Sequence, residues 1–568
     1  MELPLLSGAI LVLLALGYVL YGGFIARQLQ LDSGTATPAT RHRDGVDFVP
    51  TPRAYLFGQH FSAIAAAGPI VGPILACQTF GWLPAILWIA LGVVFIGAVH
   101  DMSTLVASVR HEARSIAEVV KGELGTRAGV SMLLFIWIAL IYVIVAFTDV
   151  TSQTFTAGDP EFQGMKFDFN QGGAVAAASL LYLAIAVTMG LVERFLKPPL
   201  WLQTAIFVPA TLMAVAAGPS LSQWLVLSPA LGLTPAQLWG VLILLYCFIS
   251  SLVPVWTLLQ PRGYLGGFIL YMALGVSVIG IFFGGFEIQG PAFKTFNAEQ
   301  SPVGLLFPFL FVTIACGACS GFHGLVCSGT TSKQVADEQH CKAVGYGAML
   351  AEGFVAVIAL VTVMIALPSD LQGKAPGTVY GLGIGRFLAV VIGEEYLPFA
   401  ITFGAMAFST FVFDTLDVST RLGRYVLQEL LGLKGRGAGI AATAATVAIP
   451  LAFILTAGSG AYQTFWTLFG TSNQMLAALS LLGITVWLQR SGKTCWYTLV
   501  PMVLMSGVTL SALTIQIYRP FFGNASATTS ELINGGVSLA MLVLAVGLLT
   551  TGARVLMSPR QVLAPAVS

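Results

Sequence analysis

The strongest constraint on this chain is a succession of apolar segments, each about twenty residues long, enough to cross a bilayer core of about 30 Å. We count fifteen of them along the 568 residues. Hydrophobic residues make up 57% of the chain and charged residues 9%, against about 25% charged residues in soluble domains. The sequence therefore predicts an all-α protein that crosses the membrane about 15 (14–18) times.

The positive charges sort onto alternate connections between these segments. If the first segment starts outside, all but five of the 26 Lys and Arg residues lie on the side that should be cytoplasmic. The exceptions are Lys166, Lys294, Lys374, Arg386 and Arg519. This bias predicts an N-terminus outside and a C-terminus in the cytoplasm. The net charge of +1 gives no reason to expect a nucleic-acid partner.

The apolar segments give explicit spans, which leave room for no soluble domain. They are 4–26, 61–79, 82–107, 130–149, 173–193, 199–218, 237–258, 264–286, 304–327, 344–367, 398–416, 438–457, 464–488, 496–518 and 534–556. We expect a cytoplasmic connection at 28–60 and an external one at 368–397. Within the latter, 380–393 is predicted to lie on the membrane surface as an amphipathic helix.

Two of these spans contain signals that interrupt a helix in mid-membrane. The second carries two Gly-Pro steps, Gly68-Pro69 and Gly72-Pro73, and the seventh carries a proline within 250–256. Proline removes a backbone donor and clashes with the preceding turn. In lipid, the released groups must face protein, water or a ligand. Both spans are therefore predicted to be broken helices that meet at a binding site.

The spacing of the two interruptions predicts an internal symmetry. They lie five spans apart and their helices run in opposite directions, as in transporters built from five-plus-five inverted repeats. On this interpretation residues 1–60 form an N-terminal helix and connection. Residues 61–424 form the core, with halves at about 61–218 and 237–424, and 425–568 are additional C-terminal helices.

Several motifs resemble the carbon starvation protein A family of bacterial inner-membrane transporters. They are Arg53-Ala-Tyr-Leu-Phe-Gly-Gln-His-Phe61, the Gly-Pro pair, Gly97-Ala-Val-His-Asp101, Gln260-Pro-Arg262, Cys316-Gly-Ala-Cys-Ser-Gly-Phe-His323, Ser328-Gly-Thr-Thr-Ser-Lys333 and Thr415-Leu-Asp-Val-Ser-Thr-Arg421. The resemblance implies uptake of peptides or of pyruvate, the latter with protons, on an inverted-repeat amino-acid-transporter architecture. Ser332, where the family more often has Pro, and Asp414 depart from the pattern, which leaves the choice between peptide and pyruvate open.

Substrate-binding candidates come from the interrupted spans and from the middle of the ninth span. Helix ends at an interruption present free N–H groups and a positive dipole end, which suit a carboxylate. The candidates are Gly68, Pro69, Gly72, Pro73, Ser250, Ser251, Trp256, Ser320 and His323. His323 is a candidate for contact with either the ligand or a proton.

Ionisable residues inside apolar spans or at their ends supply the candidates for proton coupling or gating, because an unpartnered charge at membrane depth costs about 2.5–3.5 kcal/mol on insertion scales. They are His60, His100, Asp101, Glu352, Asp414, Asp417 and Arg421. Asp417 and Arg421 are four residues apart and are predicted to belong to an ion-pair ladder at an inner gate. A static anchor or a hydrated position at the interface is the alternative for each of these residues.

Two further groups lie in the ninth span and directly after it. The hydroxyls of Ser328, Thr330 and Thr331 form a candidate cation site for sodium, or else pack helices together. Cys316, Cys319, His323 and Cys327 lie on one face of a continuous helix, but the first and last are about 16 Å apart along it. They are too far apart to share one metal ion, so no metal site is predicted.

Together these features predict a secondary active transporter, not an enzyme, that imports a small carboxylate nutrient with protons and needs no cofactor. No nucleotide-binding loop of the Gly-x4-Gly-Lys-Ser/Thr type occurs, which argues against a fused ATP motor. A sodium-coupled carrier of the same fold and a membrane nutrient sensor are the alternatives. The lipid bilayer and the small-molecule substrate are the expected partners, and homo-oligomerisation is left open.

Overall fold

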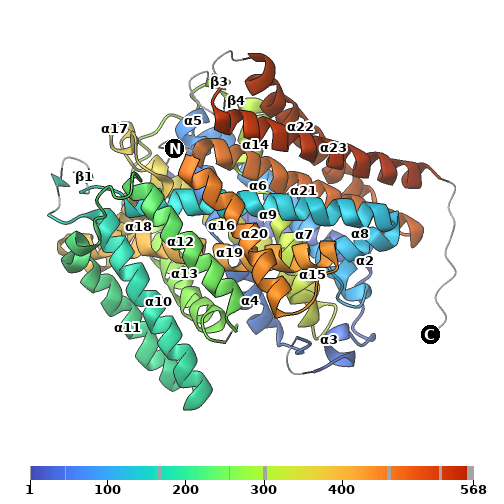
Figure 1. Cartoon of the computed structure of the whole chain (residues 1–568), viewed down its shortest axis with the longest axis horizontal. Coiled ribbons are helices and arrows are strands. Elements are labelled where there is room, and N and C mark those ends of the chain that lie inside the picture. The colour runs from blue at the N-terminus through green and yellow to red at the C-terminus, as the bar shows by residue number, and fades with distance from the viewer. Residues whose placement is uncertain are drawn as a thin grey trace.

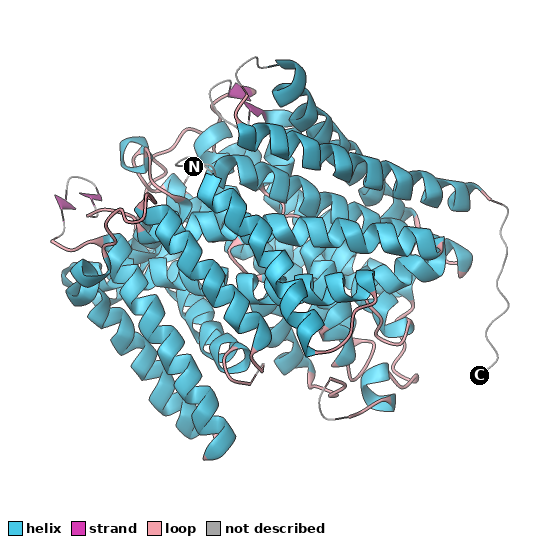
Figure 2. Cartoon of the chain, viewed as in Figure 1, coloured by secondary structure: helices cyan, strands magenta, loops and turns pink. Residues whose placement is uncertain are grey.

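The computed structural model describes residues 2–44, 47–159, 161–162, 165–166, 168–254, 256–298, 304–456, 462–523 and 527–558. Val255 in the predicted break at 250–256 and the end of the predicted C-terminal unit lie outside them. Most described residues are helical (Figure 2). The strands form two short hairpins, β1 (Glu161–Phe162) with β2 (Met165–Lys166) and β3 (Asn297–Ala298) with β4 (Gly304–Leu305).

The helices follow one another along the chain with short connections (Figure 1). The first set is α1 (Leu3–Leu16), α2 (Gly22–Leu29), α3 (Pro38–Arg41), α4 (Arg53–Ile64), α5 (Gly68–Phe80), α6 (Trp82–Gly92), α7 (Ala98–Arg110), α8 (Ile116–Leu124), α9 (Thr126–Phe155), α10 (Gln171–Phe195), α11 (Leu200–Leu221), α12 (Pro235–Leu252) and α13 (Leu259–Phe283). The second set is α14 (Leu306–Thr313), α15 (Gly321–Gly329), α16 (Ala348–Met364), α17 (Pro368–Leu371), α18 (Pro376–Ile392), α19 (Leu397–Leu431), α20 (Arg436–Thr456), α21 (Tyr462–Arg490), α22 (Trp496–Tyr518) and α23 (Thr529–Met557). Helical turns of other pitch extend some of these, so that Leu3–Leu29, Trp82–Arg110 and Lys342–Met364 are each one span.

The predicted all-α polytopic fold is confirmed. Among the described residues, thirteen helices are long and apolar enough to cross a membrane, or fourteen if the bent pair α4–α5 is one span. The remaining predicted span, 304–327, is the pair α14 and α15, whose halves are each too short to cross alone.

The second span is broken as predicted, and the position of the break is now defined. α4 and α5 meet at an angle of 47° across residues 65–67, and α5 begins at Gly68. Pro69 lies in the first turn of α5, where its missing N–H has no helical partner to lose. The first Gly-Pro step therefore starts a helix directly after the break, while Pro73 lies inside that helix.

The second interruption does not lie where the sequence predicted it. α12 ends at Leu252 and α13 begins at Leu259, so Pro254 lies in the connection between two spanning helices. The continuous ninth helix is also wrong, because 314–320 is nonhelical and separates α14 from α15. Cys316 and Cys319 lie in this nonhelical segment and not on one helical face with His323.

Two stretches of the chain repeat one order of helices (Figure 1). After the broken pair α4–α5 come a spanning helix (α6–α7), the short α8, the long α9, then α10 and α11. After the broken pair α14–α15 come a spanning helix ending in α16, the short α17 and α18, the long α19, then α20 and α21. Because α4 packs against α15 and α5 against α14, the two broken helices run antiparallel, as in an inverted repeat.

Residues 380–393 do not form a surface helix. They belong to α18, which packs closely along α19. A side-chain carbon on Gly381 would lie 2.7 Å from the Cβ of Ala405, and one on Gly385 would lie 2.9 Å from the backbone of Ile401. Glycines four residues apart form one face of a helix and allow this close approach in a membrane, so the predicted amphipathic face is a helix-packing face.

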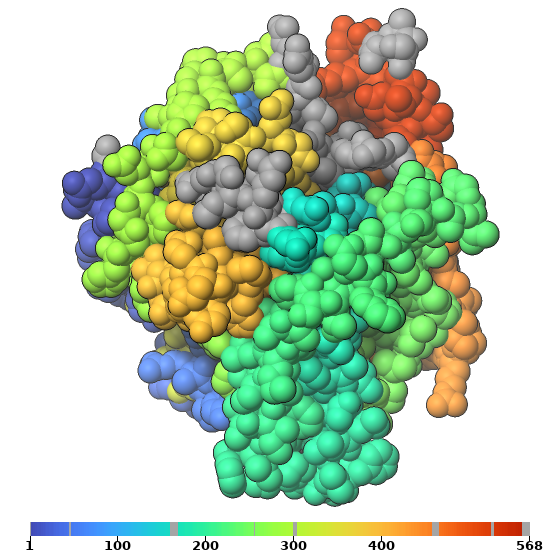
Figure 3. All heavy atoms as spheres, turned by 90° about the vertical axis from the view of Figure 1, so that its left-hand side faces the viewer, coloured from blue at the N-terminus to red at the C-terminus, as the bar shows by residue number. Residues whose placement is uncertain are grey.

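The two ends of the bundle differ in what they carry. In Figure 1 the N-terminus, α17 and both hairpins lie toward one end, and α3 lies toward the other. α10 and α11 project from the rest of the bundle, as Figure 3 shows from the side. On the α3 end, the connection after α2 pairs with the chain after α15 through a bridge between Thr51 and Val335.

Candidate substrate and proton site

The two breaks meet where α5 crosses α14. A side-chain carbon on Gly72 would collide with the carbonyl oxygen of Thr313, and one on Gly68 would collide with the thiol of Cys316. Only glycine at these positions lets the two backbones approach so closely. The sequence prediction that Gly68 and Gly72 lie at a meeting point of broken helices therefore agrees with the geometry, although the partner helix is α14–α15.

Side chains of neighbouring helices bind the carbonyl groups released at the end of α14. The indole N–H of Trp88 lies 3.2 Å from the carbonyl oxygens of Phe311 and Ile314. The indole N–H of Trp466 donates to the carbonyl oxygen of Thr313 at 3.0 Å. Since a buried carbonyl in lipid needs a partner within the protein, these two tryptophans stabilise the broken geometry.

Asn473 of α21 caps the other side of the break. Its side-chain oxygen accepts a hydrogen bond of 2.8 Å from the backbone N–H of Phe322, in the first turn of α15. Its amide nitrogen lies 3.1 Å from the hydroxyl of Ser320 and 3.2 Å from the sulfur of Cys316. The predicted binding residue Ser320 is thus fixed at the N-terminus of α15, directly at the break.

Four ionisable side chains from three helices form one buried chain beside this crossing. His323 Nδ1 lies 2.9 Å from Asp101 Oδ2, and His323 Nε2 lies 3.1 Å from Glu352 Oε2. His100 Nδ1 lies 2.7 Å from the other oxygen of Asp101. All four side chains are at most 1% exposed. These residues, which the sequence picked out singly in α7, α15 and α16, are neighbours in the fold.

His60 of α4 continues this chain toward the α3 end of the bundle. Its Nδ1 lies 2.9 Å from the hydroxyl of Thr331, and its Nε2 lies 3.8 Å from the sulfur of Cys327. The thiol of Cys327 in turn lies 3.5 Å from the backbone oxygen of Asp101. Polar groups thus follow one another from Glu352 to the end of α4.

The composition of this cluster suits proton transfer. His323 lies between the carboxylates of Asp101 and Glu352, and an imidazole can gain or lose a proton near neutral pH. Oε1 of Glu352 and Nε2 of His100 make no hydrogen bond to any residue that the structure describes, and Oε2 of Glu352 has only its contact with His323. A buried charge is tolerated only when it is partnered or neutralised. A change of charge on His323, Asp101 or Glu352 therefore changes how strongly the other two side chains hold their protons.

A second buried ionic centre joins α12, α13 and α19. The guanidinium of Arg262 forms ion pairs with Asp417 and with Asp414, the latter through Nη2 at 2.5 Å. Asp417 also accepts hydrogen bonds from the hydroxyls of Tyr246 at 2.7 Å and Ser250 at 2.5 Å. Because Nε and Nη2 bond Asp414 and Nη1 bonds Asp417, charge-assisted hydrogen bonds on two sides hold the planar guanidinium in one orientation. The centre therefore joins the middle of α19 to the two helices that separate the repeats.

Comparisons with known proteins give the family of the chain. The sequence profile of the family described as Carbon starvation protein CstA matches residues 4–376 and 369–512. The chain belongs to the CstA family. This is a family of transporters, so the chain is a multi-pass membrane transporter and not an enzyme.

Relatives extend over nearly the whole chain. The peptide transporter CstA of Campylobacter jejuni is 35% identical over 87% of this chain and 77% of its own length. The pyruvate/proton symporter BtsT of Escherichia coli is 33% identical over 91% of this chain and 83% of its own length. The peptide transporter CstA of Bacillus subtilis is 32% identical over 94% of each chain. Among solved structures, a manganese transporter of Eremococcus coleocola aligns with 89% of this chain and 98% of its own, at 14% identity and a TM-score of 0.45.

The predicted ladder within α19 of this CstA-family transporter is wrong in its pairing. Asp417 pairs with Arg262 and not with Arg421. Arg421 instead donates to the backbone oxygens of Ser250 and Val253, at 2.7 and 2.9 Å. Carbonyl groups at a helix C-terminus lack helical partners and attract cations. Arg421 therefore caps the end of α12.

Of the predicted residues near 250–256, only Ser250 contacts this second centre, through Asp417. Ser251 lies 3.4 Å from the hydroxyl of Thr443 of α20. The ring of Trp256 lies under the guanidinium of Arg194, 5.6 Å from the ring centre. The predicted substrate residues therefore lie in two regions, one at the crossing of the broken helices and one around the end of α12.

The hydroxyls of the predicted cation site point in different directions. Ser328 Oγ bonds the carbonyl oxygen of Gly324 at 2.6 Å, and Thr330 Oγ1 bonds that of Val326 at 3.0 Å. Thr331 faces His60. Within the described residues no group of three or more His, Cys, Asp or Glu side chains is placed to hold a metal ion.

Sequence reasoning missed two residues that shape these sites. Arg262 was noted only within the motif Gln260-Pro-Arg262, although an arginine beside a long apolar run is itself a functional signal. Asn473 was not noted at all. The adjacent amides Asn473 and Gln474 lie within the predicted span 464–488, and buried amides in lipid require partners.

Proposed function

We propose that this CstA-family transporter imports a small carboxylate nutrient, a peptide or pyruvate, together with protons. The observation that carries the proposal is the contact of His323 with both Asp101 and Glu352 beside the crossing of two broken helices. The relatives, named as a peptide transporter and as a pyruvate/proton symporter, support the same substrate class.

The substrate is proposed to bind at the break. Both α5 and α15 begin there, and helix N-termini present N–H groups and positive dipole ends to an anion. The carboxylate would lie beside the break, near Gly68 and Pro69 at the start of α5 and Ser320 at the start of α15, while Gly72 and Pro73 hold α5 against α14. Ser250 contacts the second centre, whereas Ser251 contacts Thr443 and Trp256 contacts Arg194, so the geometry supports a positioning role for all three.

Alternating access is proposed to come from movement of the repeated units, 53–225 and 306–490, about this crossing. Protons would bind at Glu352 or Asp101 through His323 and leave past His60 and Thr331. In this scheme Arg262, Asp414 and Asp417 hold α19 to α12 and α13. The same proposal places the protein in the bacterial inner membrane, with its N-terminus outside and its C-terminus in the cytoplasm.

Sodium coupling through Ser328, Thr330 and Thr331 has less support. The three hydroxyls are held in different directions, Ser328 and Thr330 by carbonyl oxygens of α15 and Thr331 by its contact with His60. A sodium ion needs several hard oxygen ligands that converge on one point. Proton coupling is therefore the version we put forward.

Uptake into proteoliposomes tests the proposal. With an acidic outside, vesicles containing the purified protein should accumulate labelled pyruvate or labelled dialanine above the equilibrium level, and a protonophore should abolish the accumulation. Accumulation that depends on external sodium at constant pH would contradict proton coupling. Saturable binding without accumulation would contradict transport and support a nutrient sensor.

A further inference from the structure

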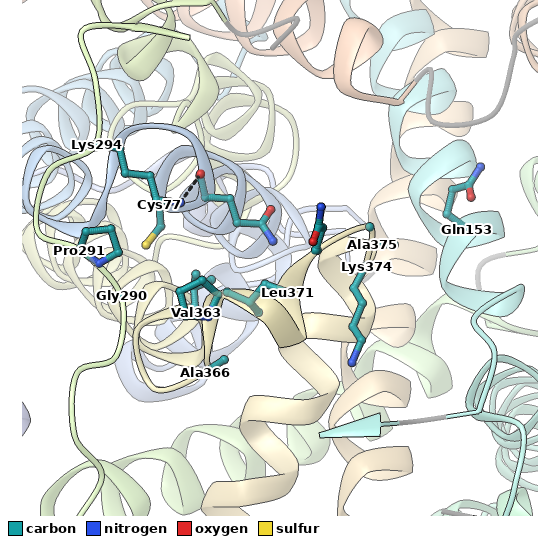
Figure 4. Close-up of a pocket in the computed structure, with 14 residues that line it drawn as sticks. Cys77, Gln153, Gly290, Pro291, Lys294, Val363, Ala366, Leu371, Lys374 and Ala375 are labelled. Atoms are coloured by element: carbon teal, nitrogen blue, oxygen red, sulfur yellow. Dashed lines mark hydrogen bonds between the residues drawn. The ribbon is translucent and has the colours of Figure 1, made fainter. Parts of the chain in front are cut away.

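A cavity of about 610 Å³ lies at the end of the bundle that carries α17. Residues of α5, α9 and α16, the segment after α13 and the α17–α18 connection line it (Figure 4). Cys77 of α5 is five residues beyond Gly72, about 7.5 Å along the helix. The cavity is therefore on the outer side of the crossing where the two broken helices meet. Ligand pockets of small organic molecules have about this size, roughly 300–1,000 Å³.

The lining of the cavity has a positive bias. Its charged side chains are Lys294 and Lys374, its amides are Gln78, Gln153 and Gln372, and none of its described lining residues is acidic. Lys294 and Lys374 are two of the five basic residues that fall on the side opposite the predicted cytoplasmic loops. Such a lining attracts anions and concentrates them within about a Debye length.

Lys294 is held in place by the backbone around it. Its N–H donates to the carbonyl oxygen of Phe80 at 3.0 Å, and its ammonium donates to that of Gln78 at 2.7 Å, the contact drawn in Figure 4. The same segment bonds to α6 through Leu83 and Ala292 at 2.9 Å and to α16 through Gln289 and Met364 at 2.7 Å. An ammonium has three donors, so the bond to Gln78 leaves capacity for a carboxylate.

We propose that this cavity is an outer binding site in which a small carboxylate is held before it reaches the broken helices. Lys294 would pair with the carboxylate, and the amides of Gln78 and Gln153 would bond its remaining oxygen or nitrogen groups. This inference rests on the proposed import function for the identity of the ligand. The charge of the cavity and its affinity for carboxylates are testable without any transport.

A reporter cysteine in the cavity measures that charge. Gln372 is exposed at the cavity, whereas six of the seven native cysteines are buried, so the variant Gln372→Cys provides a selective thiol and the unmodified protein provides the blank. The rates of its modification by an anionic and by a cationic methanethiosulfonate are compared in sealed vesicles. Adding Lys294→Gln should lower the anionic-to-cationic rate ratio by roughly two- to fivefold, because loss of one positive charge disfavours the anionic reagent and favours the cationic one while salt screens both effects. The matched control is Lys434→Gln, which removes an exposed charge from the α19–α20 connection and should leave the ratio unchanged.

The same reporter tests for the ligand. Pyruvate or dialanine should slow modification of the Gln372→Cys variant, the uncharged amide of pyruvate should not, and Lys294→Gln should weaken the protection severalfold. An unchanged rate ratio with Lys294→Gln, or no protection by either carboxylate, would overturn the outer site. Protection without gradient-driven uptake would support the outer site and overturn the import function. Gradient-driven uptake without protection would support the import function and overturn the outer site.

Discussion

His323 and Arg262 each lie between two carboxylates, but the two side chains differ in chemistry. An imidazole changes charge near neutral pH, whereas a guanidinium stays protonated under all physiological conditions. The carboxylates Asp101 and Glu352 can therefore exchange a proton through His323. Asp414 and Asp417 face a permanent charge, which suits a fixed structural contact. At the scale of single residues, the coupling function belongs to the first centre.

The fixed role of the second centre predicts a loss of stability. Arg262→Met leaves the fully buried carboxylate of Asp417 without its cation, and removal of one partner of a buried ion pair typically costs about 3–5 kcal/mol. Thermal unfolding in detergent should show a clearly lower Tm. The control Arg554→Met removes an exposed arginine of α23 and should leave the Tm unchanged. An unaltered Tm for Arg262→Met would contradict the structural role.

Among the helical elements, the crossing of α5 and α14 decides whether the two breaks can form one site. A side-chain carbon at Gly72 has no room against the backbone of Thr313. The sequence alone indicated the importance of Gly72 from the Gly-Pro spacing. It did not identify the helix that Gly72 contacts.

The close approach of the two helices predicts the effect of one methyl group. Gly72→Ala should force α5 away from α14 and reduce uptake at least tenfold, while the amount of protein in the membrane stays near that of the wild type. Gly275→Ala provides the matched control, because Gly275 lies in the middle of α13 with open space where the methyl would go. Uptake by Gly72→Ala equal to that of Gly275→Ala would contradict the role of the crossing.

The break in α14–α15 could not be read from the usual signals. Residues 314–320 contain a glycine but no proline, and they are as apolar as a continuous span. The break is stabilised by side chains of other helices that bind the released backbone groups. They are Trp88 of α6 and Trp466 and Asn473 of α21. These contacts arise only in the folded chain. Pro254, in contrast, is a strong local signal, yet it lies in a connection, where proline is ordinary.

Local patterns predicted the spans and the ionisable residues more successfully. Apolar length depends only on the bilayer, so it could be read directly from the chain. Glu352 and Asp101 stood out because charges inside apolar spans are rare. Their contact through His323 depends on how α7, α15 and α16 pack, which no local pattern contains. The glycines of α18 were visible, but a spacing of four on a short helix fits both a surface helix and a packed one.

For the whole molecule, the alternation of basic residues predicts one orientation in the membrane. The end of the bundle with α17 and the outer cavity faces outside in this orientation, and the α3 end faces the cytoplasm. An inverted repeat requires its two broken helices to cross in opposite directions, and the packing of α4 on α15 and α5 on α14 has this property. The orientation therefore follows from the basic residues, and the repeat from the packing of the broken helices.

Reporter fusions test the orientation. A green fluorescent protein joined to the C-terminus should fluoresce, because it folds in the cytoplasm. Alkaline phosphatase joined after residue 367, beyond α16, should be active, since that connection is predicted to lie outside. The control fusion after residue 335, beyond α15, should be inactive. The opposite pattern of phosphatase activity would contradict the predicted topology and place the outer cavity on the cytoplasmic side.

The most direct test of proton-coupled import compares two fluxes in proteoliposomes containing the Glu352→Gln variant. The amide keeps the shape of the side chain beside His323 but cannot carry a proton. Exchange of labelled for unlabelled substrate needs no net proton movement, so it should stay near the wild-type rate, whereas accumulation driven by a pH gradient should be lost. Full gradient-driven accumulation by this variant would contradict the account.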